Sequence, residues 1–200
     1  MIVSHDRQRV LLANHVRHQH KKIYTTLAGF VEVGESMESA VVREVYEETG
    51  IRVDTTRPMQ YIGTQPWPFP QSCMIGFIAT ADDRNQQISI DPLEIYDAQW
   101  FSKEEIIAAT TVVGSTLQTQ VTEKAFQENP NLSCVIPPKG VIARKLIDTW
   151  LFEGGSERQQ LQNDASTAST ATTFPYDDAA TSTTMAANHD EQVVHRIRII

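Results

Sequence analysis

Hydrophobic and polar residues alternate over much of the first 100 positions, and one stretch departs from this alternation with a helical spacing. Between Met37 and Thr49 the apolar residues recur every three or four positions, as on the buried face of an amphipathic helix. Ser36 can cap the start of this helix and Gly50 its end. Around it, β-branched or alternating segments predict strands at residues 9–16, 24–33, 51–56, 60–65, 73–80, 86–90 and 97–101.

Two more helices are predicted in the second half of the chain, at residues 103–112 and 137–152. In the second of them, Pro137 and Pro138 precede the helical spacing. The apolar residues that share its buried face are Ile142, Leu146, Ile147, Trp150 and Leu151. Strands outnumber helices, and the two do not alternate strictly. The predicted fold class is therefore α+β or a mixed α/β/α sandwich.

The composition changes after residue 153. Between Ala165 and Ala187, 17 of 23 residues are Ala, Ser or Thr, with no core-forming stretch. We therefore expect one domain at residues 1–153 and a low-complexity, disordered tail at 154–200. The only apolar cluster in this tail is its last eight residues, VVHRIRII. They could add a strand somewhere, but the expectation favours no structural role for them.

Charge and cysteine content narrow the chemistry. The net charge of −8 argues against a general surface for nucleic acid or anionic membranes, so a nucleotide substrate would need a divalent cation. The two cysteines show no CxxC spacing, which excludes a zinc ribbon in this chain and favours a reducing compartment. The start of the sequence sustains no apolar run of signal-peptide or membrane-helix length. The default expectation is a cytoplasmic protein without a membrane partner.

The predicted helix at 37–49 carries the run REVYEE, which contains Arg43, Glu44, Glu47 and Glu48. At helical spacing the three carboxylates project into one volume and repel one another. One interpretation is a solvated acidic face on which Arg43 pairs with Glu47. The other is a site for Mg²⁺ or Mn²⁺, because such a cation joins one or two carboxylates to substrate phosphates.

The wider segment GFVEVGESMESAVVREVYEETGI, from Gly29 to Ile51, favours the second interpretation. It resembles the Nudix box, G-x5-E-x7-R-E-U-x-E-E-x-G-U with U a bulky aliphatic residue, and every defined position matches. The resemblance implies a Nudix α/β/α sandwich whose loop, helix and loop bind a divalent metal and hydrolyse a nucleoside diphosphate linked to another group. It makes Glu44, Glu47 and Glu48 metal ligands and Arg43 the residue that orients one of them. Glu35 and the two glycines of the box would be structural.

A second motif follows the box, in the stretch GTQPWPFPQS. It resembles the SQPWPFPxS signature of the NADH pyrophosphatase branch of the Nudix family, with Thr64 in place of the first Ser. Alone it could be a proline-stiffened connector, but aromatic rings on a stiff loop can also stack a purine or nicotinamide ring. The choice between Trp67 and Phe69 as the stacking ring stays open. The residues that the resemblance makes substrate contacts are Gln65, Pro66, Trp67, Pro68, Phe69, Pro70, Gln71 and Ser72.

Three further positions carry over from the same branch. The segment DPLEIYDAQWF maps the glutamate that completes the metal site onto Glu94, and it has Asp97 at the next acidic position. In TLAGF, Ala28 sits where a backbone carbonyl ligates the metal. In the closing helix, Ala143 sits where the backbone meets the substrate. The resemblance therefore gives Arg43, Glu44, Glu47, Glu48 and Glu94 as catalytic, and these glutamates with Ala28 as metal ligands.

The chain also departs from this branch. Its members usually carry an N-terminal domain and a zinc ribbon, which this sequence lacks, and its start falls inside the first Nudix strand, so part of that strand is expected to be missing. Residues 102–136 exceed the usual link to the last helix and are expected to be an insertion with an extra loop and helix. A homodimer is left open. The histidines His15, His18 and His20 favour a solvated or phosphate-steering loop over a metal site.

The resulting hypothesis is a hydrolase that uses Mg²⁺ or Mn²⁺, and no zinc, to split the diphosphate of NADH, and more weakly NAD⁺, into nicotinamide mononucleotide and AMP. The general base is Glu47 or Glu94. One alternative is removal of the NAD cap from RNA by the same residues. Another is a truncated, non-catalytic relative that still binds a dinucleotide or a metal.

Overall fold

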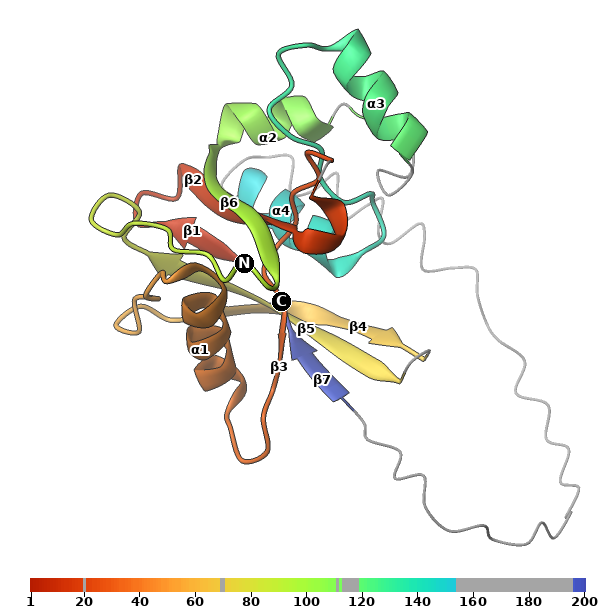
Figure 1. Ribbon diagram of the computed structural model, residues 1–200. Coiled ribbons are helices and arrows are strands. Elements are labelled where there is room, and N and C mark those ends of the chain that lie inside the picture. Colours follow the sequence, from red (N-terminus) through yellow and green to blue (C-terminus); the bar gives the residue numbers. More distant parts are fainter. Residues whose placement is uncertain (20, 69–70, 111, 113–118, 154–195) are drawn as a thin grey trace, which may run out of the picture. The chain divides into compact units, whose positions relative to one another are not determined.

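The structure, a computed structural model, describes residues 1–19, 21–68, 71–110, 112, 119–153 and 196–200. Its strands are β1 (Ile2–Ser4), β2 (Arg9–His15), β3 (Gly29–Phe30), β4 (Gln60–Trp67), β5 (Ser72–Ala81), β6 (Ile95–Ser102) and β7 (Arg196–Ile199). Its helices are α1 (Met37–Thr49), α2 (Lys103–Thr110), α3 (Thr119–Glu128) and α4 (Ile142–Leu151), with a short 3-10 helix at Val16–His18. The described residues 1–151 and 196–200 belong to one compact unit (Figure 1).

The strands form one mixed sheet in the order β3-β7-β5-β1-β2-β6, with β4 paired to β5. Strand β5 is the long central element, and β4 runs antiparallel along one side of it. Along the other side lie two short parallel strands, β7 beside Ser72–Ile75 and β1 beside Ala79–Ala81. Strands β7 and β1 therefore share one flank of β5, one after the other.

Helices cover both faces of this sheet. The apolar face of α1, with Ala40, Val41 and Val45, packs in a core with alternate residues of the strands. Helix α4 covers the opposite face, where a methyl group on Gly76 of β5 would lie 3.0 Å from the Ile142 side chain. The buried row of α4 is the one that the sequence predicts, with Trp150 fully buried. The fold is thus an α/β/α sandwich with a mixed sheet, as expected.

The bounds of α1 agree with the prediction because its end signals are local. The hydroxyl of Ser36 accepts a hydrogen bond from the Ser39 N–H, which satisfies one of the free donors of the first turn. Gly50 ends the helix with a φ of +69°, a left-handed conformation that favours glycine.

Several predicted strands are shorter than expected or missing. The segment 24–33 contributes Gly29–Phe30 and a single bridge from Thr25 to Ala13, and the segment 51–56 only a single bridge from Val53 to Ala81. The segment 86–90 forms no strand, so that prediction is wrong. Instead, the side-chain amide of Gln86 hydrogen-bonds both backbone groups of Arg52, which ties the two segments together without a ladder.

The proline-rich stretch is more regular than expected. Strand β4 continues through Pro66 and Trp67, and Trp67 pairs with Ser72 of β5. Proline is tolerated here because β4 lies at the edge of the sheet and needs its backbone donors on one side only.

The last residues of the chain correct the prediction that they have no structural role. Strand β7 pairs with β3 on one side and with β5 on the other, and Ile199 and Ile200 are 3% and 6% exposed. Burial of these two side chains supplies the hydrophobic free energy that a short isolated strand lacks. The rest of the predicted tail, residues 154–195, lies outside the described residues.

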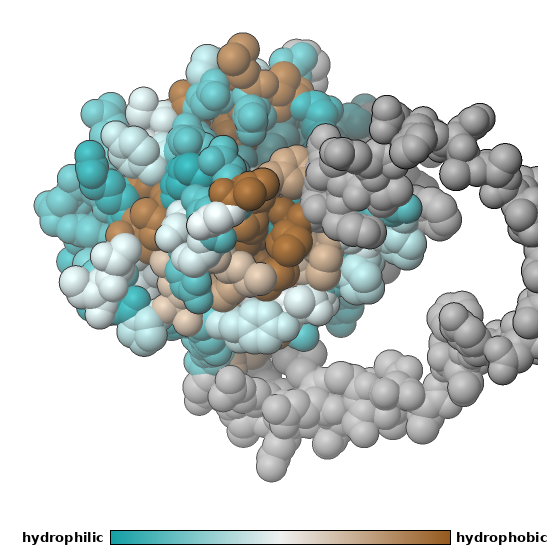
Figure 2. Space-filling view, turned by 90° about the horizontal axis from the view of Figure 1, so that it is seen from below, coloured by the Kyte–Doolittle hydropathy of each residue, from teal (hydrophilic) through white to brown (hydrophobic). Residues whose placement is uncertain are grey.

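The side chains of β7 on the α1 face are covered unequally, since Ile197 is exposed and Ile199 is buried. Viewed from below (Figure 2), hydrophobic residues gather near the middle of a largely hydrophilic face. Of the elements at this end, the turn after β3 exposes Val33 and β7 exposes Ile197, whereas Ile199 is covered.

The expected insertion at residues 102–136 does contain a helix, α3. None of the described helices is long and apolar enough to cross a membrane.

Candidate metal and dinucleotide site

The Glu44 carboxylate packs directly on the backbone of β3. A methyl group added at Gly29 would lie 1.8 Å from Cδ of Glu44, closer than any two such atoms can come. Any side chain there would displace the Glu44 carboxylate, which gives a physical reason for the first glycine of the box. The contact fixes α1 against β3 and holds Glu44 at the edge of the sheet.

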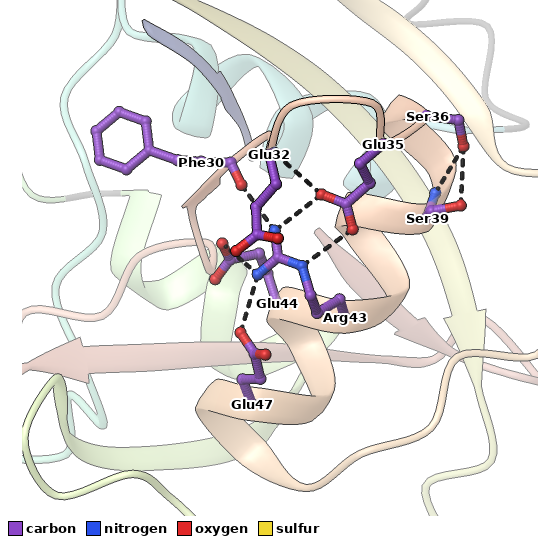
Figure 3. A network of polar contacts seen from close by, with 8 residues as sticks. All are labelled: Phe30, Glu32, Glu35, Ser36, Ser39, Arg43, Glu44 and Glu47. Carbon is purple, nitrogen blue, oxygen red and sulfur yellow. Dashed lines mark hydrogen bonds and ion pairs between the residues drawn. The ribbon is translucent and has the colours of Figure 1, made fainter.

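Arg43 connects three acidic residues of the box, Glu35, Glu44 and Glu47, as Figure 3 shows. Its Nε and Nη2 donate to the two oxygens of Glu35 at 2.9 Å each, and Nη2 also donates to the Phe30 carbonyl. Its Nη1 donates to Glu44 at 3.0 Å and to Glu47 at 2.9 Å. A planar guanidinium suits this arrangement because its donors form a rigid fork. Glu35 is therefore a structural residue, and Arg43 orients Glu44 and Glu47.

Glu48 has the fewest polar contacts to offset the burial of its carboxylate among the glutamates of the box. It is 2% exposed, and neither of its oxygens has a hydrogen-bond partner among the described residues. Burial is the main cause that raises its pKa, the nearby Glu44 and Glu94 add to the rise, and the Arg198 guanidinium and the Ala28 backbone partly offset it. The resulting pKa is about 8. An uncompensated buried carboxylate is unfavourable unless a cation joins it.

Glu44 shows the same trend more weakly. Burial raises its pKa, Arg43 opposes the rise, and Glu47 and Glu94 add to it. These mutual effects on the pKa values indicate that Glu44, Glu48 and Glu94 lie close together, with the Ala28 backbone beside Glu48. Glu47 lies at the exposed border, held toward Arg43. Five predicted metal-site residues therefore occupy one region, contributed by α1, the segment before β3 and the segment before β6.

The residues present fit a divalent metal that shares its ligands with substrate and water. Among the described residues, no group of three or more His, Cys, Asp or Glu side chains is placed to hold a metal ion. Mg²⁺ and Mn²⁺ do not need such a group, because Mg²⁺ usually takes one or two carboxylates and completes its shell with phosphate oxygens and waters. The orphaned Glu48 carboxylate, with Glu44 and Glu94 close by, supplies such a partial ligand set.

The hairpin residues divide into two groups. The Gln65 side chain accepts a hydrogen bond from the Ile142 N–H at 2.9 Å and donates one to the Gly140 carbonyl at 3.0 Å. It thus fixes the start of α4, and with it Ala143, against β4. The Trp67 side chain is 39% exposed, so its ring can stack on a ring of a ligand.

The other residues of the motif lie at the border of this hairpin. Pro66, Pro68 and Gln71 are exposed, and Ser72 is half-buried at the start of β5. The two remaining predicted contacts, Phe69 and Pro70, lie outside the described residues.

Asp97 and the histidines of the HVRHQH segment make contacts outside the candidate metal site. Asp97 accepts hydrogen bonds from the Tyr24 hydroxyl and the Gln99 amide. Burial lowers the pKa of His15 to about 4, so its ring is neutral at pH 7 and cannot steer phosphates by charge. Burial also lowers the pKa of His18, and His20 lies outside the described residues.

Sequence reasoning missed one charged residue near the site, Arg198. It lies on β7, and its positive charge reaches Glu48. The available signal was the alternation of Arg and Ile at the end of the chain, which is the period of a strand with one buried face.

Comparisons with known proteins agree with the resemblance. The model of the NUDIX domain matches residues 1–117. Two curated relatives, both called NAD-capped RNA hydrolase NudC, are 46% identical: one from Haemophilus influenzae (strain PittGG) over 144 residues, and one from Pasteurella multocida (strain Pm70) over 140. These matches cover 71% and 70% of this chain but only 43% and 41% of the relatives.

Among solved structures, a hydrolase of the NUDIX family from Clostridium perfringens aligns with 63% of this chain and 89% of its own. It is 24% identical, with a TM-score of 0.43. The family itself rests on the match of the NUDIX domain, which covers more than half of the chain. The chain belongs to the Nudix family.

Proposed function

We propose that this chain is a metal-dependent diphosphatase that hydrolyses NADH, and more weakly NAD⁺, to nicotinamide mononucleotide and AMP. The observation that carries the proposal is the buried Glu48 carboxylate, which has no hydrogen-bond partner among the described residues and lies beside Glu44 and Glu94. The QPWPFPQS hairpin supports a dinucleotide as the substrate, because its exposed Trp67 can stack a ring. The names of the 46% identical relatives support a substrate that contains NAD.

In this proposal the carboxylates of Glu44, Glu48 and Glu94 and the Ala28 carbonyl hold Mg²⁺ or Mn²⁺. When bound, the cation lowers the pKa of a water and offsets the charge of the diphosphate. Arg43 keeps Glu44 and Glu47 in place through its hydrogen bonds. Glu47 or Glu94 accepts the proton of the attacking water. A new bond forms between the water oxygen and one phosphorus, and the bond from that phosphorus to the bridging oxygen breaks.

The test is incubation with NADH and either Mg²⁺ or Mn²⁺, followed by separation of the nucleotides. AMP and reduced nicotinamide mononucleotide in equal amounts are expected, and a chelator should prevent their release. Absence of AMP from protein that unfolds cooperatively on heating would contradict the proposal and favour a non-catalytic, dinucleotide-binding relative.

The printed name of the relatives favours a second candidate, removal of the NAD cap from RNA. Both substrates share the diphosphate, so the same carboxylates would act on either. The ratio of kcat/KM for NADH and for a short NAD-capped RNA separates the two. A phosphate-reading RNA surface further requires that RNA binding weaken steeply with salt.

A further inference from the structure

One row of side chains crosses four strands of the sheet beside α4. Arg198 of β7 lies opposite Phe30 of β3 on one side and Met74 of β5 on the other. Met74 in turn lies opposite Gln65 of β4. Directly opposed residues point to the same face of a sheet, so these four side chains share one face. It is the α4 face, because Gln65 hydrogen-bonds the Ile142 backbone at the start of that helix.

The guanidinium of Arg198 has at least one N–H donor without a hydrogen-bond partner among the described residues. Its Cζ lies 4.3 Å from the centre of the Phe30 ring, a cation–π contact that uses none of its N–H groups. Its Nε is buried and has no hydrogen-bond partner among the described residues. A guanidinium carries five N–H donors, and a buried donor without an acceptor costs free energy. An acceptor brought by a ligand would remove this cost.

Strand β7, which carries Arg198, lies in the sheet between β3, on which Glu44 packs, and the hairpin of β4 and β5. The charge of Arg198 lowers the pKa of Glu48 against the stronger effects of burial, Glu44 and Glu94. It shares its sheet face with Gln65 of the QPWPFPQS motif. A diphosphate that bridges the metal site and a base near Trp67 would have to pass this position. A planar fork of donors there matches two phosphate oxygens.

We propose that Arg198 binds a phosphate oxygen of the substrate, so that the C-terminal strand β7 forms one wall of the active site. This proposal rests on the proposed function in so far as the phosphate belongs to a dinucleotide. The metal-binding carboxylates and Arg198 would hold the diphosphate from two sides, with Phe30 keeping the guanidinium in place.

The experiment compares Arg198→Gln and Arg198→Lys with the control Ile197→Ala in the full chain. Ile197 is the neighbouring residue on β7, and its exposed side chain points to the other face. We expect Arg198→Gln to raise KM for NADH about 10- to 100-fold with a smaller change in kcat, because the contact exists before the transition state. Arg198→Lys should recover part of the loss, since it keeps the charge but not the fork. The control should match the wild type.

A binding measurement separates this proposal from the proposed function. Calorimetric titration with inorganic pyrophosphate and Mg²⁺ should show at least a tenfold weaker Kd for Arg198→Gln. If no variant and not even the wild type cleaves NADH, this difference still supports the phosphate contact. An unchanged KM and an unchanged Kd in folded Arg198→Gln would overturn it and leave the hydrolase proposal standing.

If Arg198→Gln does not fold, the decision falls to Arg198→Lys. There the loss of the second hydrogen bond predicts roughly a three- to tenfold rise in the pyrophosphate Kd. A lowered Tm with wild-type KM and Kd would show that Arg198 only packs on Phe30, which also overturns the proposal.

Discussion

Helix α1 and strand β7 both bring charged side chains to Glu48, but they are specified in different ways. Helix α1 carries its own cap residues, its own apolar spacing and a guanidinium that organises its carboxylates. Strand β7 has four residues and acquires its structure only between β3 and β5. The comparison teaches that the α1 carboxylates are the locally encoded half of this candidate site, whereas the positive charge that β7 adds depends on a strand from the far end of the chain.

The largest effect should come from the locally encoded half. Glu48→Gln removes the charge that a metal would join, and we expect kcat for NADH to fall roughly 10³-fold or more, comparable to the loss of a strong transition-state contact. The matched control is Glu38→Gln, an exposed residue of the first turn of α1, which should retain activity. Steady-state AMP release measures both. Turnover of Glu48→Gln within a few-fold of the wild type would contradict the assigned metal site.

The next effect tests whether β7 belongs to the folded domain. Ile199→Ala removes a side chain that is 3% exposed in the core beneath α1, and it should lower the free energy of unfolding by about 2–5 kcal/mol. Ile197→Ala on the same strand removes an exposed side chain and should change it by less than about 0.5 kcal/mol. Urea unfolding gives both values. Equal effects would mean that β7 is not held in the sheet.

Gly29 connects the two halves, because β3 contacts both α1 and β7. Gly29→Ala puts a methyl group onto the Glu44 carboxylate, and we expect activity to fall about 10- to 100-fold, as when a residue that orients a metal ligand is lost. Gly34→Ala is the comparison: its methyl group meets nothing within 4 Å, but its φ of +85° carries backbone strain. A drop in Tm without a drop in kcat for Gly29→Ala would separate packing from ligand placement.

The charge of Glu48 also predicts a pH-dependent stability without metal. Its folded pKa of about 8 lies above the usual 4.5, so the free energy of unfolding should fall as pH rises between these values and level off above pH 8. Glu48→Gln should remove this fall, which is on the order of a few kcal/mol at pH 8.5. Thermal unfolding with a chelator measures it. Saturating Mg²⁺ should stabilise the wild type and so narrow the difference in pH dependence between it and Glu48→Gln. An identical pH profile for both proteins would refute the burial of the Glu48 carboxylate.

The smallest effect concerns the hairpin. Gln65→Ala removes two hydrogen bonds to the start of α4 and should cost about 1–2 kcal/mol of stability, against almost nothing for the exposed Gln60→Ala on the same strand. A raised KM with unchanged stability would instead indicate that Gln65 contacts the substrate directly. Thermal unfolding and KM for NADH, measured side by side, distinguish the two roles.

Most of the candidate metal site was predictable because Glu44, Glu47 and Glu48 lie on one helix. Spacing alone brings Glu44 and Glu48 together, and the box motif adds Gly29 and Glu35. Glu94 required the family resemblance, since nothing near it in the sequence indicates that it faces α1. The predicted strands at 51–56 and 86–90 failed for the opposite reason: β-branched residues there favour an extended chain, but side-chain hydrogen bonds from Gln86, rather than a ladder, hold the two segments together.

The sequence by itself determined the family, the bounds of α1 and the identity of the acidic residues, because caps, helical spacing and the box motif act over a few residues. Only the tertiary structure decided that the last strand enters the sheet between β3 and β5, that Gln65 holds the start of α4, and that the charge of Arg198 reaches Glu48. A strand of four residues gains no stability from its own sequence. Its position depends on the apolar surface and the unpaired backbone groups that β3 and β5 present to it.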